Sequence, residues 1–114
     1  MTDLEITRLC AEAMGLQRVT VNMLARPGIG ANPPYVSGSY TGTSMDVHYD
    51  PLHDDAQAMA LVKKLGLEIH CREDRNGWYV GFVNNDSMVP HADRNRAICE
   101  CVANMRLERQ KEAA

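Results

Sequence analysis

The sequence predicts an α+β fold, specifically a three-layer α/β/α sandwich in which helices cover both faces of a small, mostly antiparallel sheet. Three observations support this prediction. Apolar residues recur at helical spacing in three segments, and they alternate with polar residues in others, which is the period of a strand. One strand-like run is apolar on both faces. Elements of these kinds bury their apolar sides by packing in layers.

The chain of 114 residues is long enough for one domain with one core, so we expect residues 1–114 to form a single domain. Hydrophobic residues make up 45% and charged residues 24%, which argues against disorder. Twelve Lys and Arg residues stand against fifteen Asp and Glu residues, a net charge of -3. This balance predicts neither a DNA-coating protein nor an acidic DNA mimic, because both need a large field of one sign.

The first helix is expected to begin at a capping box, in which Thr2 and Glu5 each satisfy a free backbone amide of the first turn. Gly15 is expected to end it, because glycine readily takes the left-handed conformation at a helix C-terminus. A short strand is expected at about residues 18–23. The apolar stripe of the helix consists of Ile6, Leu9, Cys10 and Ala13.

Residues 26–44 are rich in Pro, Gly and Ser, which predicts a long loop within the domain. Long loops in compact domains are more often functional than accidental. Tyr35 and Tyr40 stand out in this segment, because a tyrosine offers a large contact area with only two side-chain torsions to restrict. We therefore consider these two residues the candidate partner-binding residues.

The second half alternates strands and helices. Residues 45–49 alternate as a half-buried strand, and a helix is expected to begin after Asp54 and to end at Gly66. Residues 67–71 and 78–83 should pair as a hairpin across Asn76-Gly77, the second strand being central and covered on both sides. A last helix is expected at about 92–111.

We expect a set of apolar residues from these elements to be largely buried. Cys10, Cys71 and Cys101 are expected to be small core residues, and all four cysteines to be free thiols. The expected core comprises Leu61, Val62, Leu65, Ile69, Trp78, Val80, Ile98, Val102 and Met105.

Two segments, residues 50–67 with the pattern P-L-x-D-D-x-x-A-x-x-L and residues 92–103 with Arg96-Ala97-Ile98, together resemble the phage ABA-sandwich domain family of small phage and prophage proteins. The resemblance implies an α/β/α fold and a phage or prophage origin. It implies no activity, catalytic residue or cofactor. The opening residues are acidic and no run reaches the length of a membrane helix, so we expect the protein in the host cell cytoplasm and away from membranes.

A polar cluster lies at the expected strand-to-helix corner: His48, Asp50, His53, Asp54 and Asp55. Imidazoles and carboxylates are ligands of zinc and manganese, so these residues are weak metal candidates. A corner of this kind also uses acidic residues as helix caps, and the spacing matches no zinc motif. We therefore assign no catalytic residue and no cofactor.

Nucleic-acid binding is a further alternative, because the last helix carries several cations. Acidic residues interleave with them, which is typical of a solvated helix face and argues against this function. The cations are Arg94, Arg96, Arg106, Arg109 and Lys111.

The sequence thus favours a phage or prophage accessory protein that is not an enzyme and that acts by binding a host or phage protein, for example as a modulator of a host system. A small metal-dependent enzyme or metal-binding domain using the His48–Asp55 corner is the first alternative, and a nucleic-acid-binding protein is the second. An open sheet edge would also allow pairing with a second copy of the chain.

Overall fold

The computed structural model describes residues 1–22, 34–71, 77–82 and 91–113, and these form three helices and five strands. The α+β class is therefore confirmed. None of the described helices combines the length and the apolar character that crossing a membrane requires. The elements are α1 (Asp3–Ala13), β1 (Gln17–Asn22), β2 (Tyr35–Ser39), β3 (Asp46–Tyr49), α2 (Asp55–Leu65), β4 (Leu67–Cys71), β5 (Trp78–Phe82) and α3 (Arg94–Ala113).

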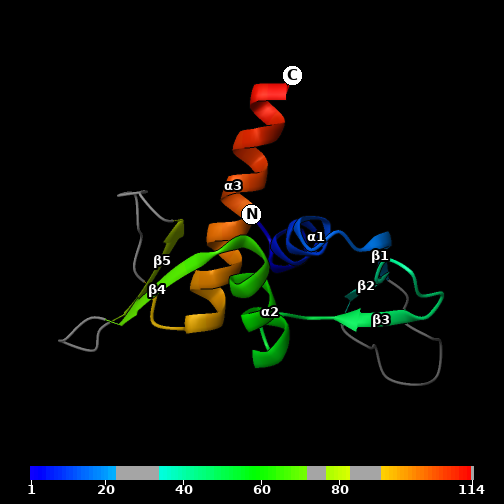
Figure 1. Cartoon of the computed structure of the whole chain (residues 1–114), viewed down its shortest axis with the longest axis horizontal. Coiled ribbons are helices and arrows are strands. Elements are labelled where there is room, and N and C mark those ends of the chain that lie inside the picture. The colour runs from blue at the N-terminus through cyan, green and yellow to red at the C-terminus, as the bar shows by residue number, and fades with distance from the viewer. Residues whose placement is uncertain (23–33, 72–76, 83–90, 114) are drawn as a thin grey trace.

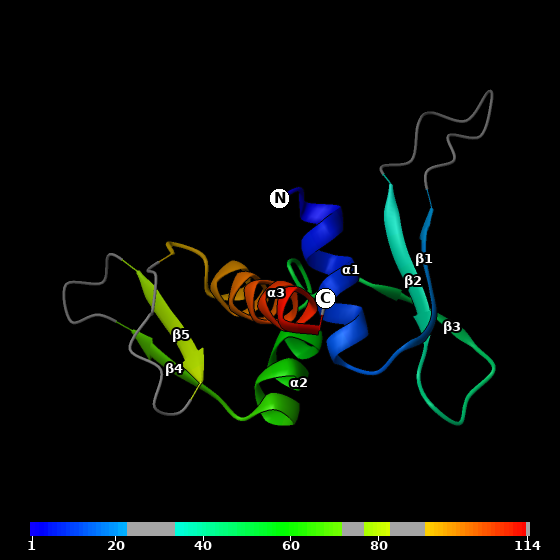
Figure 2. The same cartoon turned by 90° about the horizontal axis from the view of Figure 1, so that it is seen from above.

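The described strands form two antiparallel sheets where one was expected. One has the order β1-β2-β3 and the other contains β4 and β5. Figures 1 and 2 show the three helices between the two sheets. The strands are antiparallel as predicted, but this arrangement does not show helices on both faces of one sheet. The expectation that β5 is a central strand is wrong for the described residues, because β4 is its only strand neighbour there.

The predicted loop over residues 26–44 is wrong at residues 35–39, which form the central strand of the three-stranded sheet. Val36 is buried against the helices, and pairing on both sides supplies the hydrogen bonds of β2. Gly38 suits a close approach, since a Cβ there would lie 3.3 Å from the Leu16 Cβ. Residues 26–33 lie outside the described residues, and residues 40–45 connect β2 to β3.

The helix ends follow the local signals in the sequence. Thr2 Oγ1 accepts from the Glu5 amide at 3.2 Å and the Glu5 carboxylate accepts from the Thr2 amide at 3.3 Å, which confirms the capping box. Gly15, with φ +78°, takes the left-handed position after α1. Asp54 caps α2, and Gly66 ends it with φ +66°. These ends position the strands that follow each helix.

The core lies where α1 and α2 pack on α3, between the sheets. Of the expected core residues, Leu61, Val80, Ile98 and Val102 are buried. The others are half-buried. Val62, Leu65, Ile69 and Trp78 pack at its margin, and Met105 is half-buried on α3.

The expectations for the cysteines hold only in part. Cys10 is buried, but Cys71, near the free end of the two-stranded sheet, is exposed and the expectation for it was wrong. Cys101 is half-buried, whereas its neighbour Cys99 is fully buried and its carbonyl accepts from the Cys10 thiol at 3.4 Å. The face of α3 that meets α1 therefore runs through Cys99.

Strand β1 contains an irregularity at Arg18. The register of β1 against β2 shifts between Gln17 and Thr20, and Arg18 has φ +55°, which is unusual for a residue other than glycine. Its guanidinium donates to Ser39 Oγ at 3.1 Å, and Ser39 Oγ donates to the Asp46 carboxylate at 2.8 Å. The irregularity thus directs the Arg18 side chain toward β2, and the hydrogen bond from Ser39 to Asp46 continues the link to β3.

Candidate functional site

The side of the three-stranded sheet that points away from α1 forms a continuous polar surface, which we call the outer face. Residues that oppose one another across antiparallel strands point to the same side, so the register Asn22–Tyr35, Thr20–Ser37–His48 and Ser39–Asp46 brings their side chains together. The alternate residues of β2 and β3 face α1, and Val36 and Tyr49 among them are each 1% exposed. The outer face comprises Arg18, Thr20, Asn22, Tyr35, Ser37, Asp46 and His48. Ser39 lies on the same side but is 0% exposed, so it links Arg18 to Asp46 without presenting a surface of its own.

The outer face is organised by hydrogen bonds and by one ring contact. The Asn22 side-chain amide donates to Ser37 Oγ at 3.0 Å. A second set of hydrogen bonds runs from Arg18 through Ser39 to Asp46. The Tyr35 ring stacks on the His48 imidazole, with centroids 4.8 Å apart and an angle of 25° between the planes. Tyr35 remains 40% exposed. The face therefore presents a supported aromatic pair beside short side chains with hydrogen-bonding groups.

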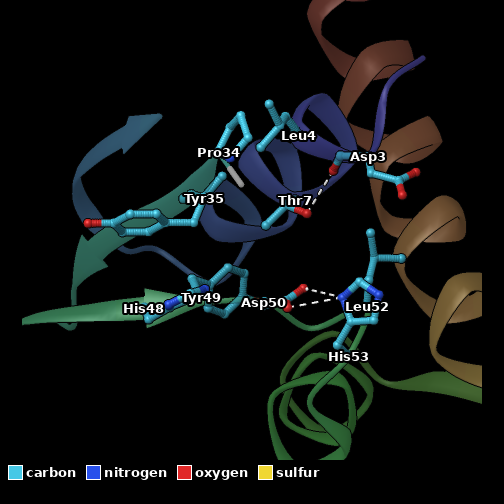
Figure 3. Close-up of a pocket in the computed structure, with 11 residues that line it drawn as sticks. Asp3, Leu4, Thr7, Pro34, Tyr35, His48, Tyr49, Asp50, Leu52 and His53 are labelled. Atoms are coloured by element: carbon cyan, nitrogen blue, oxygen red, sulfur yellow. Dashed lines mark hydrogen bonds and ion pairs between the residues drawn. The ribbon is translucent and has the colours of Figure 1, made fainter. Parts of the chain in front are cut away.

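A cavity of about 380 Å³ opens at the Tyr35–His48 end of this face (Figure 3). Its walls come from the first turns of α1, from the start of β2 and from the corner between β3 and α2. Figure 3 shows the Tyr35 ring projecting away from the α1 residues, while Asp50 and His53 face each other across the corner. The His53 Nδ1 lies 3.0 Å from each Asp50 carboxylate oxygen. The lining residues are Asp3, Leu4, Thr7, Pro34, Tyr35, Val36, His48, Tyr49, Asp50, Leu52 and His53.

The structure divides the polar cluster expected at the strand-to-helix corner. His48, Asp50 and His53 all line the cavity, but His48 stacks on Tyr35 and only Asp50 and His53 pair. Asp54 accepts from the Gln57 amide at 3.1 Å as the cap of α2. Asp55 points elsewhere and accepts from the Asn95 amide at 2.8 Å.

Metal binding gains no geometric support from this corner. Within residues 1–22, 34–71, 77–82 and 91–113, no three His, Cys, Asp or Glu side chains converge in a way that would hold an ion. The acidic residues of the corner instead cap α2 and tie it to α3.

The two candidate tyrosines differ in their placement. Tyr35 begins β2 and belongs to both the outer face and the cavity lining. Tyr40 follows the other end of β2, at the turn toward β3, where it is 37% exposed and its carbonyl accepts from the Thr43 amide at 3.0 Å. Tyr40 therefore lies at the end of β2 away from the cavity. Burial, and to a lesser degree Tyr40, raises the pKa of the Tyr49 hydroxyl, which is on the side of the sheet that faces α1.

The cations of α3 are largely engaged within the protein. Arg94 pairs with Asp55 at 3.3 Å, and Arg106 pairs with Glu12 at 3.7 Å. Arg96 contacts Asp3 at 2.7 Å, and this hydrogen bond raises the pKa of the guanidinium. Three of the five cations considered for nucleic acid thus hold helices together.

Sequence reasoning missed Arg18, Asn22 and Ser37 as members of the outer face. The signal available for Ser37 was the alternation of Tyr35, Ser37 and Ser39 with Val36 and Gly38, which the breaker-rich composition obscured. No local pattern marks Arg18, because its place depends on the irregular pairing of β1 with β2.

The chain matches no protein-family model, no curated protein and no solved structure. The resemblance to the phage ABA-sandwich family therefore stays a prediction, and the functional argument rests on the geometry of the outer face and the cavity.

Proposed function

We propose that this protein is a small protein-binding module and that the outer face is its contact surface. The observation that carries the proposal is the Tyr35–His48 stack, which stands on a sheet face over which no described helix or strand lies (Figure 2). Half of this pair is Tyr35, one of the two residues that sequence reasoning put forward for partner binding.

The composition of the outer face supports a protein partner. It contains Tyr35 and Arg18, residue types in which interfaces are enriched, and neither Lys nor Glu, in which they are depleted. Asp46 and Ser37 are of depleted types, so Tyr35 and Arg18 carry this part of the argument. Tyr, Ser and Asn are also the residues that binding surfaces use for adaptable contacts. Arg18 and Asp46, linked through Ser39, balance each other in charge. The face therefore attracts neither a polyanion nor a polycation.

The geometry of the aromatic pair also suits binding. A stacked ring has already lost part of its side-chain freedom, so a partner that contacts it restricts fewer torsions on association. Tyrosine is among the residue types that dominate binding energy at interfaces. If the phage or prophage origin implied by the sequence holds, the partner is a host or phage protein, and modulation of a host system is one form of this function.

Affinity capture from host cell lysate tests the proposal with a matched control. Tyr35→Ala removes the exposed ring of the outer face, and Met59→Ala removes a side chain of similar exposure, 43%, on α2. We expect the parent and Met59→Ala to retain the same protein, and Tyr35→Ala to bind it about 30-fold more weakly, the effect of losing a central anchor. Equal retention by Tyr35→Ala would contradict the proposal, provided that its free energy of unfolding stays within about 1 kcal/mol of the parent.

A further inference from the structure

The cavity at the Tyr35–His48 end of the outer face has an apolar interior. Val36 and Tyr49 are each 1% exposed and Leu52 is 6% exposed, and Leu4 adds a half-buried side chain from α1. A volume of about 380 Å³ lies within the range of roughly 300–1,000 Å³ found for ligand pockets. The interior therefore suits an apolar group.

The rim of the cavity carries two carboxylates and the His53 imidazole. Asp3 and Asp50 both line it, but their partners differ. Arg96 donates to the Asp3 carboxylate at 2.7 Å, whereas the partner of the Asp50 carboxylate is the His53 imidazole at 3.0 Å. Asp50 is therefore the rim carboxylate that is not matched by an arginine or lysine within the described part of the chain, and its side chain is 37% exposed.

The cavity and the outer face are continuous. Tyr35 and His48 line the cavity and also form the aromatic pair of the outer face. The interior of the cavity lies on the side of the sheet that faces α1, so a polypeptide segment on the outer face that continues past Tyr35 around the end of the sheet would reach its mouth and could insert a side chain there. This continuity favours a protein segment over a separate small molecule as the occupant.

We propose that the cavity is the anchor site for the partner protein, and that it takes an apolar side chain of about the size of leucine with a lysine or arginine next to it in the partner chain. The apolar side chain fills the space between Leu4, Val36 and Leu52. The neighbouring cation contacts the Asp50 carboxylate at the rim, where an acidic neighbour is repelled. This inference rests on the proposed function and adds the chemistry of the segment that is recognised.

Peptide titration of the full chain, labelled with ¹⁵N and followed by amide chemical shifts, tests this inference without knowledge of the partner. The probes are N-acetyl-Leu-Lys-amide, N-acetyl-Leu-Glu-amide and N-acetyl-Gly-Lys-amide. We expect the Leu-Lys peptide to bind with a dissociation constant of about 1 mM, as suits so small a ligand, and to shift the amides of Leu4, Thr7 and Leu52. The other two peptides should bind at least about tenfold more weakly, because each lacks one of the two recognised features.

Two variants test the role of the rim. Asp50→Asn removes the rim charge, and Asp54→Asn removes the same charge outside the cavity lining while keeping a good helix cap. We expect Asp50→Asn to raise the dissociation constant of the Leu-Lys peptide about five- to tenfold, and Asp54→Asn to leave it unchanged. The peptide comparison on the parent chain needs no variant, so it decides the question even if Asp50→Asn fails to fold.

Equal binding of the Leu-Glu peptide, equal effects of the two variants, or no shift at these amides at about ten times the expected dissociation constant would each overturn the anchor site. If the peptides fail but Tyr35→Ala still loses the captured protein, the outer face binds its partner without this anchor. If the Leu-Lys peptide binds as expected but Tyr35→Ala captures its partner normally, the anchor site stands and the outer face is not the contact surface.

Discussion

The two sheets lie on opposite sides of the helices, and their outward surfaces are built from different kinds of residue. On the two-stranded sheet, Leu67 and Val80 face inward, while Glu68, His70 and Tyr79 lie on the outward side. His70 is opposite Tyr79 in the register and lies 3.6 Å from Glu68. On the three-stranded sheet the outward positions hold the Tyr35–His48 pair and short hydrogen-bonding side chains. Both sheets meet the same requirement to cover the helices. Packing therefore explains their inner faces, and the proposed function assigns a use to only one of the outward surfaces.

The largest effect should come from the helix that the two regions share. Ile98 of α3 is fully buried between the sheets, so Ile98→Ala should lower the free energy of unfolding by about 2–5 kcal/mol through lost burial and the resulting cavity. Urea unfolding followed by Trp78 fluorescence and by hydrogen exchange at Val36 reports on the two sheets separately. The urea midpoints from both probes should shift by the same amount. A shifted midpoint from only one probe would show that the two sides of the molecule unfold independently.

A pair of glycine substitutions distinguishes the two regions. Gly38→Ala adds a methyl group 3.3 Å from the Leu16 Cβ, where the three-stranded sheet meets the helices, and should cost about 1–3 kcal/mol. Gly66→Ala meets no atom within 4 Å but must hold a φ of +66°, so it should cost about 1 kcal/mol. Thermal unfolding gives both values. A larger loss for Gly66→Ala would mean that packing against Leu16 is looser than the structure shows.

Alkaline pH should weaken the helical layer between the sheets. Burial raises the pKa of the Cys101 thiol from 9.0 to about 11 and also raises that of the Tyr49 hydroxyl. Above about pH 9 the unfolded chain releases a proton from Cys101 that the folded chain keeps, so this contribution to stability is present below pH 9 and is lost as the pH rises toward 11. Melting temperatures between about pH 8 and 11 should therefore fall, and less steeply in Cys101→Ala. Identical slopes would contradict the assignment to Cys101.

The smallest effect on stability, and the sharpest test of the contrast, comes from one added lysine on each outward surface. Ser37→Lys and Glu68→Lys should each change the free energy of unfolding by about 1 kcal/mol or less, because both positions lie on partly exposed strand faces. Only Ser37→Lys should abolish capture of the partner. Loss of capture with Glu68→Lys as well would mean that the two surfaces do not differ in function.

Local signals in the sequence predicted the elements well, because they depend on neighbours along the chain. The capping box at Thr2, the glycine at position 66 and the pairing of β4 with β5 are all of this kind. The strand at residues 35–39 was missed, because Ser and Gly have low strand propensity and the strand is held by partners on both sides. The division into two sheets was missed although every pairing among the described strands joins consecutive strands, because no local pattern indicates that β3 and β4 are not paired with each other.

The candidate site was found in part. His48, Asp50, His53 and Tyr35 were singled out, and the structure brings all four to one cavity. Their arrangement was not predictable, because it requires β2 to lie beside β3 so that Tyr35 meets His48. The contribution of α1 to the cavity depends on how that helix packs, since the long segment between α1 and β2 carries no local signal for it.

The irregularity at Arg18 also bears on how the protein stays dispersed in a crowded solution. A long, regular edge strand is a template on which an extended segment from another molecule can add, and chains of such additions form fibrils. The edge strand β1 shifts register between Gln17 and Thr20, where Arg18 has a left-handed conformation. Its outward amides and carbonyls therefore do not match the regular hydrogen-bond spacing of an incoming strand. The opposite edge, β3, offers only Asp46–Tyr49. Contacts with other molecules are thereby directed to side chains, and indiscriminate strand addition is suppressed.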